Sequence, residues 1–98
     1  MTVSVSIHEL AALELADAVN YYESRISGLG RSFLDEIERA VKEITDQPEA
    51  APVIYKFVRR KLLRRFPYSL MYSLTGDTIR ILCVANQKRR PSYWYRRV

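Results

Sequence analysis

The end of the chain combines cationic and aromatic side chains in a way that suits the binding of nucleic acid. Five of the ten residues from 88 to 97 are Lys or Arg and three are aromatic: Lys88-Arg89-Arg90-Pro91-Ser92-Tyr93-Trp94-Tyr95-Arg96-Arg97. Lys and Arg neutralise phosphates and release their counterions, and aromatic rings stack on unpaired bases. The alternative interpretation of Trp94 is that its ring closes the hydrophobic core.

A second group of cations stands earlier in the chain, at 59–61 and 64–65. Because side chains alternate along a strand, Arg60 and Arg64 are predicted to share one face, and Arg59 and Lys61 the other. Part of this group and the tail are predicted to form a positive groove beside the last strand. The alternative is that these arginines only coat a solvated face. The predicted target-binding residues are Arg60, Arg64, Arg65, Arg89, Arg90, Tyr93, Trp94 and Arg96.

The two halves of the chain carry opposite charge. Residues 1–48 have four basic and nine acidic side chains, a net charge of −5, whereas residues 49–98 have twelve basic and two acidic side chains, a net charge of +10. Such a division, with an isoelectric point near 9.6, predicts a polyanionic or acidic partner for the basic half.

Catalysis is less well supported by the residue types than binding. Metal-free cleavage of RNA needs proton donors and acceptors with pKa values near neutrality, and histidine usually supplies them. The only histidine, His8, lies in the acidic half. Arginine stabilises charge but is a poor proton acceptor, and tyrosine, Lys61 or Lys88 would serve only with a strongly lowered pKa.

No metal site and no cofactor are predicted, because no CxxC pair and no cluster with the spacing of metal ligands occurs. The lone Cys83 lies in the apolar run 79–85 and is interpreted as a small buried hydrophobe. Since no apolar stretch approaches the ~20 residues of a membrane span, we expect a cytoplasmic protein without membrane contact.

The elements that position these residues follow from periodicity. Residues 2–6 predict a short strand, and the S-x-x-E pattern from Ser6 to Glu9 predicts a capping box. Two helices are expected over 9–24 and 31–45, joined by a turn at 27–30 that contains Gly28 and Gly30. The first has a broad apolar surface, which suggests burial on more than one side, and the second has one apolar stripe. We therefore expect an antiparallel helical hairpin.

The remainder reads as a three-stranded meander. Strands are expected over 58–63, 68–74 and 78–85, with a corner at 64–67 and a tight turn at 75–77. The last strand is almost wholly apolar, as expected for a strand buried on both faces. The sequence predicts one domain over 1–98, of α+β class: an N-terminal strand and a two-helix hairpin packed on a small antiparallel sheet.

These elements, in this order, carry motifs that resemble one known family. The motifs are Tyr21-Tyr22-Glu23, Gly28-Leu29-Gly30 with Phe33, Pro48, Arg65-Phe66-Pro67-Tyr68 leading to Tyr72, and Val84-Ala85-Asn86-Gln87-Lys88-Arg89-Arg90-Pro91-Ser92-Tyr93-Trp94. The chain is similar to the RelE/ParE toxins of bacterial toxin–antitoxin pairs, also called the plasmid stabilisation family. The resemblance implies a growth-inhibiting toxin that a cognate antitoxin wraps and neutralises in a hetero-oligomer.

The resemblance leaves two targets open. ParE-like members poison DNA gyrase, and RelE-like members cleave mRNA on the ribosome; as such a nuclease, this chain would use Arg65, Arg89, Arg90 and Tyr93. RelE-like enzymes usually have an arginine where this chain has Ser69, and close relatives often have a histidine where it has Asn86. Losing both removes charge stabilisation and proton transfer, which favours the ParE-like, non-enzymatic reading. A third alternative is a degenerate toxin that persists as an antitoxin-binding scaffold.

Overall fold

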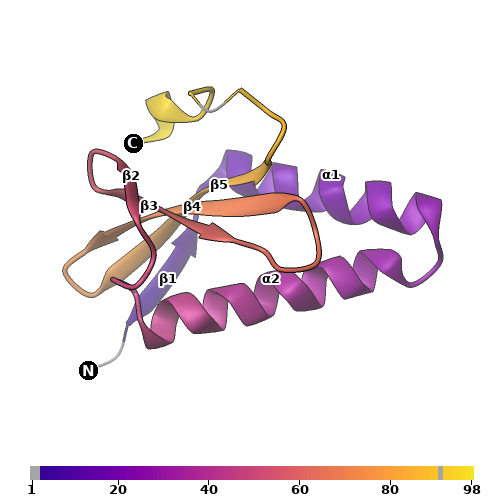
Figure 1. Ribbon diagram of the computed structural model, residues 1–98, viewed down its shortest axis with the longest axis horizontal. Coiled ribbons are helices and arrows are strands. Elements are labelled where there is room, and N and C mark those ends of the chain that lie inside the picture. Colours follow the sequence, from indigo (N-terminus) through magenta and orange to yellow (C-terminus); the bar gives the residue numbers. More distant parts are fainter. Residues whose placement is uncertain (1–2, 91) are drawn as a thin grey trace.

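A five-stranded sheet separates two helices from the C-terminal segment (Figure 1). The computed structural model describes residues 3–90 and 92–98, so the predicted strand start at Thr2 and Pro91 of the tail motif lie outside the described residues. The elements in chain order are β1 (Ser4–Ile7), α1 (Glu9–Arg25), α2 (Leu29–Asp46), β2 (Val53–Tyr55), β3 (Val58–Leu62), β4 (Tyr68–Thr75), β5 (Thr78–Asn86) and a 3₁₀ turn (Tyr95–Arg97).

The sheet order is β1-β5-β4-β3-β2. Strands β3, β4 and β5 form the predicted antiparallel meander. The pairing of β1 with β5 is parallel, with Val5 opposite Ile79. The predicted α+β class with a helical hairpin is confirmed, but the sheet is mixed rather than wholly antiparallel, because the hairpin carries the chain from β1 back to the start of the meander.

The two helices pack on one face of the sheet, and a glycine in α2 allows them to approach each other closely. The prediction of a second helix beginning at Arg31 was wrong by two residues: α2 begins at Leu29, and Gly30 lies in its first turn. A Cβ on Gly30 would lie 2.7 Å from the carbonyl oxygen of Val19. The Glu23 carboxylate accepts hydrogen bonds from the N–H groups of Gly28 (3.0 Å) and Gly30 (3.0 Å), satisfying donors at the start of α2.

The C-terminal segment covers the opposite face of the sheet. Trp94 is 1% exposed and packs with Val58, Met71 and Leu82 in a second apolar cluster. The ring of Tyr95 stacks on Tyr55 of β2 with 3.7 Å between centroids. The sheet is therefore covered on both sides, which explains the apolar sequence of β5 and confirms its predicted burial on both faces.

Two local predictions were wrong, and one strand was missed. Ser6 lies in β1 instead of capping α1; His8 is the N-cap, and its Nδ1 accepts from the Leu10 N–H at 3.1 Å. Strand β2 was not foreseen, because three residues are too short to establish a period. Arg60 and Arg64 do not share a face, since β3 ends at Leu62 and the chain has turned before Arg64.

Candidate functional site

A cavity of about 270 Å³ lies between the sheet and the C-terminal segment. We call it the tail-side cavity. No Asp or Glu lines it, and its lining residues are Arg60, Leu62, Ser69, Met71, Ala85, Asn86, Gln87, Arg89, Arg90, Tyr93 and Trp94. Strand alternation places Arg60 of β3 and Ser69 of β4 on this face, and Asn86 ends β5 just before the basic run. The two departures from the RelE-like pattern, Ser69 and Asn86, thus line the same cavity.

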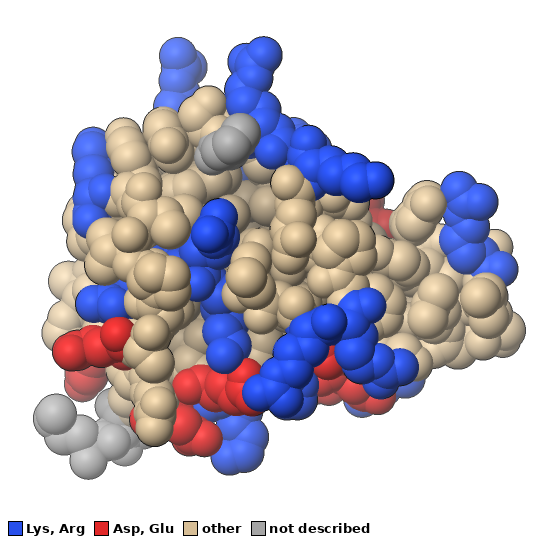
Figure 2. Space-filling view, in the orientation of Figure 1, with Lys and Arg blue, Asp and Glu red and all other residues tan. Residues whose placement is uncertain are grey.

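The arginines of the tail-side cavity have no acidic partner among the residues that the structure describes. No ion pair joins Arg60, Arg89 or Arg90 to a carboxylate within residues 3–90 and 92–98. In Figure 2, Lys and Arg project from the upper part of the view, where the C-terminal segment lies, whereas Asp and Glu gather along the lower part, over α2. The cavity therefore lies in a region of unbalanced positive charge.

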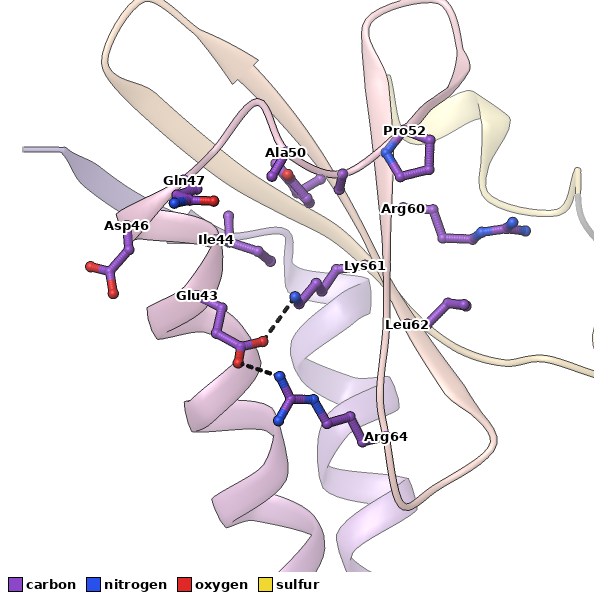
Figure 3. A pocket seen from close by; sticks show the side chains of 12 residues that line it. Glu43, Ile44, Asp46, Gln47, Ala50, Pro52, Arg60, Lys61, Leu62 and Arg64 are labelled. Atoms are coloured by element: carbon purple, nitrogen blue, oxygen red, sulfur yellow. Dashed lines mark hydrogen bonds and ion pairs between the residues drawn. The ribbon is translucent and has the colours of Figure 1, made fainter.

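On the helix side, by contrast, the cations are matched by carboxylates. Glu43 of α2 lies 2.8 Å from Lys61 Nζ and 3.0 Å from Arg64 Nη2 (Figure 3). Arg39 pairs with both Glu43 and Glu36. The hydrogen bond from Lys61 lowers the pKa of Glu43, and the one from Arg39 adds to the effect. Arg64, predicted to bind a target, is thus engaged by α2.

A second and larger hollow, which we call the edge groove, separates the C-terminal end of α2 from β3 (Figure 3). It has a volume of about 550 Å³. Lys61 points into it toward Glu43, whereas Arg60 and Leu62 point away from α2. Strand β2 pairs with β3 only at Val58 and Arg59, so the part of β3 beyond Arg60 forms an open edge along the groove.

Tyr93 is held by a network that ties the C-terminal segment to α1. Its hydroxyl lies 3.0 Å from Glu14 Oε2 and 2.9 Å from Cys83 Sγ. The hydroxyl has one proton, and the carboxylate accepts it, so the Cys83 thiol donates to the Tyr93 oxygen. Arg97 completes the network with two hydrogen bonds to Glu14, of 2.8 and 2.9 Å.

The network changes the protonation of its members. Burial, together with the bond to Cys83 and the charge of Glu14, raises the pKa of Tyr93 far above its ordinary value. Burial raises the pKa of Cys83 to about 11, consistent with the predicted inert, buried cysteine. Burial opposes the charge on Glu14, but hydrogen bonds from Arg97, the Val84 N–H and Tyr93 outweigh it and hold its pKa below the usual value.

The network also orients one cavity arginine. The Arg89 guanidinium lies over the Tyr93 ring, 4.0 Å from its centroid. Electrostatic attraction to the face of an aromatic ring stabilises a cation there and restricts its movement. The Tyr93 ring thus restricts the position of Arg89, and the Tyr93 hydroxyl forms hydrogen bonds with Glu14 and Cys83.

The predicted site residues fall into two groups. Arg60, Arg89, Arg90, Tyr93 and Trp94 line one cavity, although the buried ring of Trp94 offers no face for stacking. Arg65, on the β3–β4 corner, and Arg96, in the 3₁₀ turn, are exposed outside the cavity, as is the paired Arg64.

Sequence reasoning missed Glu14, and it assigned Arg97 to the positive groove, whereas the structure pairs Arg97 with Glu14. These residues are 83 positions apart, and no local pattern joins them.

The described residues contain no group of three His, Cys, Asp or Glu side chains arranged to hold a metal ion. Over the same residues, neither helix combines the length and apolar character needed to cross a membrane.

Fold and site together define a small basic α+β domain with an unneutralised cationic cavity on one face of its sheet. The sequence pattern of the family described as the ParE toxin of type II toxin–antitoxin systems, parDE, matches residues 5–91, and the chain belongs to this family. The predicted resemblance is thereby confirmed.

Known relatives agree with this assignment. Toxin ParE2 of Mycobacterium tuberculosis, in strains CDC 1551 and H37Rv, is 29% identical over 96 residues, covering 94% of this chain and 89% of the relative. A solved structure described as the chromosomal ParDE system from P. aeruginosa superposes with a TM-score of 0.65 at 21% identity, over 87% of this chain and 96% of that one. This last likeness concerns the fold.

Proposed function

We propose that this ParE-family protein inhibits growth by poisoning DNA gyrase, and that it does so by binding rather than by cutting. In this proposal Arg60, Arg89 and Arg90 are the principal contacts to the gyrase–DNA complex. Arg65 and Arg96 are exposed outside the cavity and add to the positive charge of the basic half of the chain. The proposal needs no metal and no cofactor.

The observation that carries the proposal is the chemistry of the tail-side cavity. It gathers three arginines that pair with no carboxylate of the described chain, and its lining residues include no histidine, carboxylate or lysine. The one titratable hydroxyl, on Tyr93, has a raised pKa and donates its proton to Glu14. A site that can bind a negatively charged group, but has no side chain able to transfer a proton near neutral pH, suits binding better than RNA cleavage.

A cognate antitoxin is the second proposed partner, as the family and the ParDE description of the structural relative suggest. The edge groove supports this part of the proposal, because an extended segment can add to the open edge of β3 there. Leu62, 53% exposed at that edge, offers an apolar contact. The toxin would then be neutralised by a segment that lies against β3 and covers Arg60 beside it.

The antitoxin contact can be tested by calorimetry with the protein encoded beside the toxin. Leu62→Asp is expected to weaken binding at least tenfold. The matched control is Ile26→Asp, since Ile26 is 63% exposed at the tip of the helical hairpin and outside the groove. Equal affinities for the two variants would contradict docking at the β3 edge.

The target is tested by assaying the purified protein, side by side, for gyrase-dependent DNA cleavage and for mRNA cleavage in a translation extract. The proposal predicts cleaved DNA only in the presence of gyrase, and intact mRNA. Ribosome-dependent mRNA cleavage with gyrase unaffected would overturn it. Inactivity in both assays, with tight antitoxin binding, would identify a scaffold instead of a toxin.

A further inference from the structure

We propose that the tail-side cavity is a binding site for one phosphodiester group of DNA. The identity of the nucleic acid rests on the proposed function, in which the target is a gyrase–DNA complex. The cavity itself supplies the chemistry for a phosphate: positive charge, hydrogen-bond donors and a restricted volume.

The charge comes from two parts of the chain. Arg60 projects from β3, and Arg89 and Arg90 follow the end of β5. Each guanidinium presents several N–H donors in a planar fork that matches phosphate oxygens. Since no described carboxylate pairs with these arginines, a bound phosphate would not have to displace an internal partner.

The polar lining also favours an acceptor-rich ligand. Asn86 accepts the Lys88 N–H with its Oδ1, so its NH₂ remains to donate. Ser69 adds a hydroxyl from β4. A phosphate, whose oxygens accept without donating, is complementary to this set of donors.

The volume argues for a phosphate group rather than a whole nucleotide. Sites for drug-sized ligands usually exceed ~300 Å³, and this cavity has about 270 Å³. The buried ring of Trp94 forms a wall and leaves no face on which a base can stack. The site is therefore expected to bind DNA without strong preference for sequence.

The cavity is already organised for binding. The Arg89 guanidinium packs on the Tyr93 ring, and hydrogen bonds to Glu14 and Cys83 hold the Tyr93 hydroxyl in position. Ordering these side chains before the ligand arrives lowers the entropic cost of binding. Tyr93 acts here as a positioning residue.

The test uses the chain's single tryptophan as the reporter. Trp94 fluorescence of the purified, antitoxin-free protein is titrated with a 20-nucleotide DNA, as single strand and as duplex, at several salt concentrations and without gyrase. Binding is expected to change the fluorescence, and pyrophosphate is expected to compete. Arg60→Gln is expected to weaken binding about tenfold and to reduce the slope of log K against log salt by about one.

Arg80→Gln is the matched control, because it removes the same charge from an exposed residue outside the cavity. Its affinity is expected to stay within about twofold of the parent, and melting curves verify that both variants are folded. Equal losses for the two variants, an unchanged Trp94 signal on binding, or tighter binding of RNA of the same sequence would each overturn the inference.

The gyrase assay separates this inference from the proposed function. Gyrase poisoning that persists in a protein unable to bind DNA by itself would refute the phosphate site and leave the function standing. Arginine-dependent DNA binding with gyrase unaffected would refute the function and leave the phosphate site standing.

Discussion

Replacement of Glu14 by Ala tests whether the buried network holds the C-terminal segment on the sheet. The Glu14 carboxylate accepts four hydrogen bonds: one from the Val84 N–H, one from Tyr93 and two from Arg97. Its substitution leaves the Arg97 guanidinium, whose side chain is 11% exposed, without its counter-charge.

The expected cost follows from these contacts. Removing one partner of a buried ion pair costs about 3–5 kcal/mol. The Glu14 side chain is 18% exposed, so solvent offsets part of the loss, and we expect a cost at the lower end of this range. A loss of ~3 kcal/mol corresponds to a fall in melting temperature of about 15 °C for a domain of this size.

The assay is thermal unfolding followed by circular dichroism at neutral pH. Asp17→Ala is the control, since Asp17 is exposed one turn further along α1 and no ion pair is found for it among the described residues. Its expected change is within about 0.5 kcal/mol. A double-mutant cycle with Arg97→Ala should yield a coupling of the same sign. Equal melting temperatures for the Glu14 and Asp17 variants would refute the reasoning.

Three further predictions concern the same architecture. The pKa values of Glu14 and Glu36 are lowered in the folded protein, so their contribution to stability is complete above the unfolded-state pKa of about 4.3 and is lost as the pH falls through the folded-state pKa values. The melting temperature should therefore stay constant from about pH 7 to about pH 5 and drop below about pH 4. The drop should be smaller in Glu14→Gln. Trp94→Ala should cost about 3–5 kcal/mol in urea unfolding, because the ring is fully enclosed, whereas Val98→Ala at the exposed chain end should change little. Gly30→Ala should destabilise by about 1–2 kcal/mol despite the higher helix propensity of alanine, because its Cβ would meet the Val19 carbonyl; a stabilised variant in the same urea assay would contradict the close approach of the helices.

Local periodicity was sufficient to predict the elements that position the site. Residues alternate along β4 as a strand pattern requires: Leu70 and Tyr72 pack in the core on the helix side, and Met71 packs in the cluster on the other. The almost wholly apolar sequence of β5 correctly indicated cover on both sides. These signals work because the burial of each side chain is set by its own strand.

The remaining features depend on distant parts of the chain. The parallel pairing of β1 with β5 joins Val5 to Ile79, and only the path of the helical hairpin determines it. The Glu14–Arg97 pair likewise exists because α1 and the C-terminal turn meet near Val84 on β5. Local sequence patterns do not indicate such contacts between distant residues.

The candidate site was predicted in part, for the same reason. The residue types identified Arg60, Arg89 and Arg90 as cations in excess, and the structure gathers them around one cavity. Arg64 was indistinguishable from them in sequence, but α2 brings Glu43 to within 3.0 Å of it. Which arginines remain unpaired is decided by tertiary packing.

The most direct test of the central claim is the yield of gyrase-linked, cleaved DNA with the parent protein and with two charge-reversal variants. Arg89→Glu with Arg90→Glu reverses two cavity cations, and Arg80→Glu with Lys42→Glu reverses two exposed cations outside the cavity. The account predicts cleavage with the parent and the control and its loss with the cavity variant, all three being folded. Undiminished cleavage with the cavity variant would contradict it.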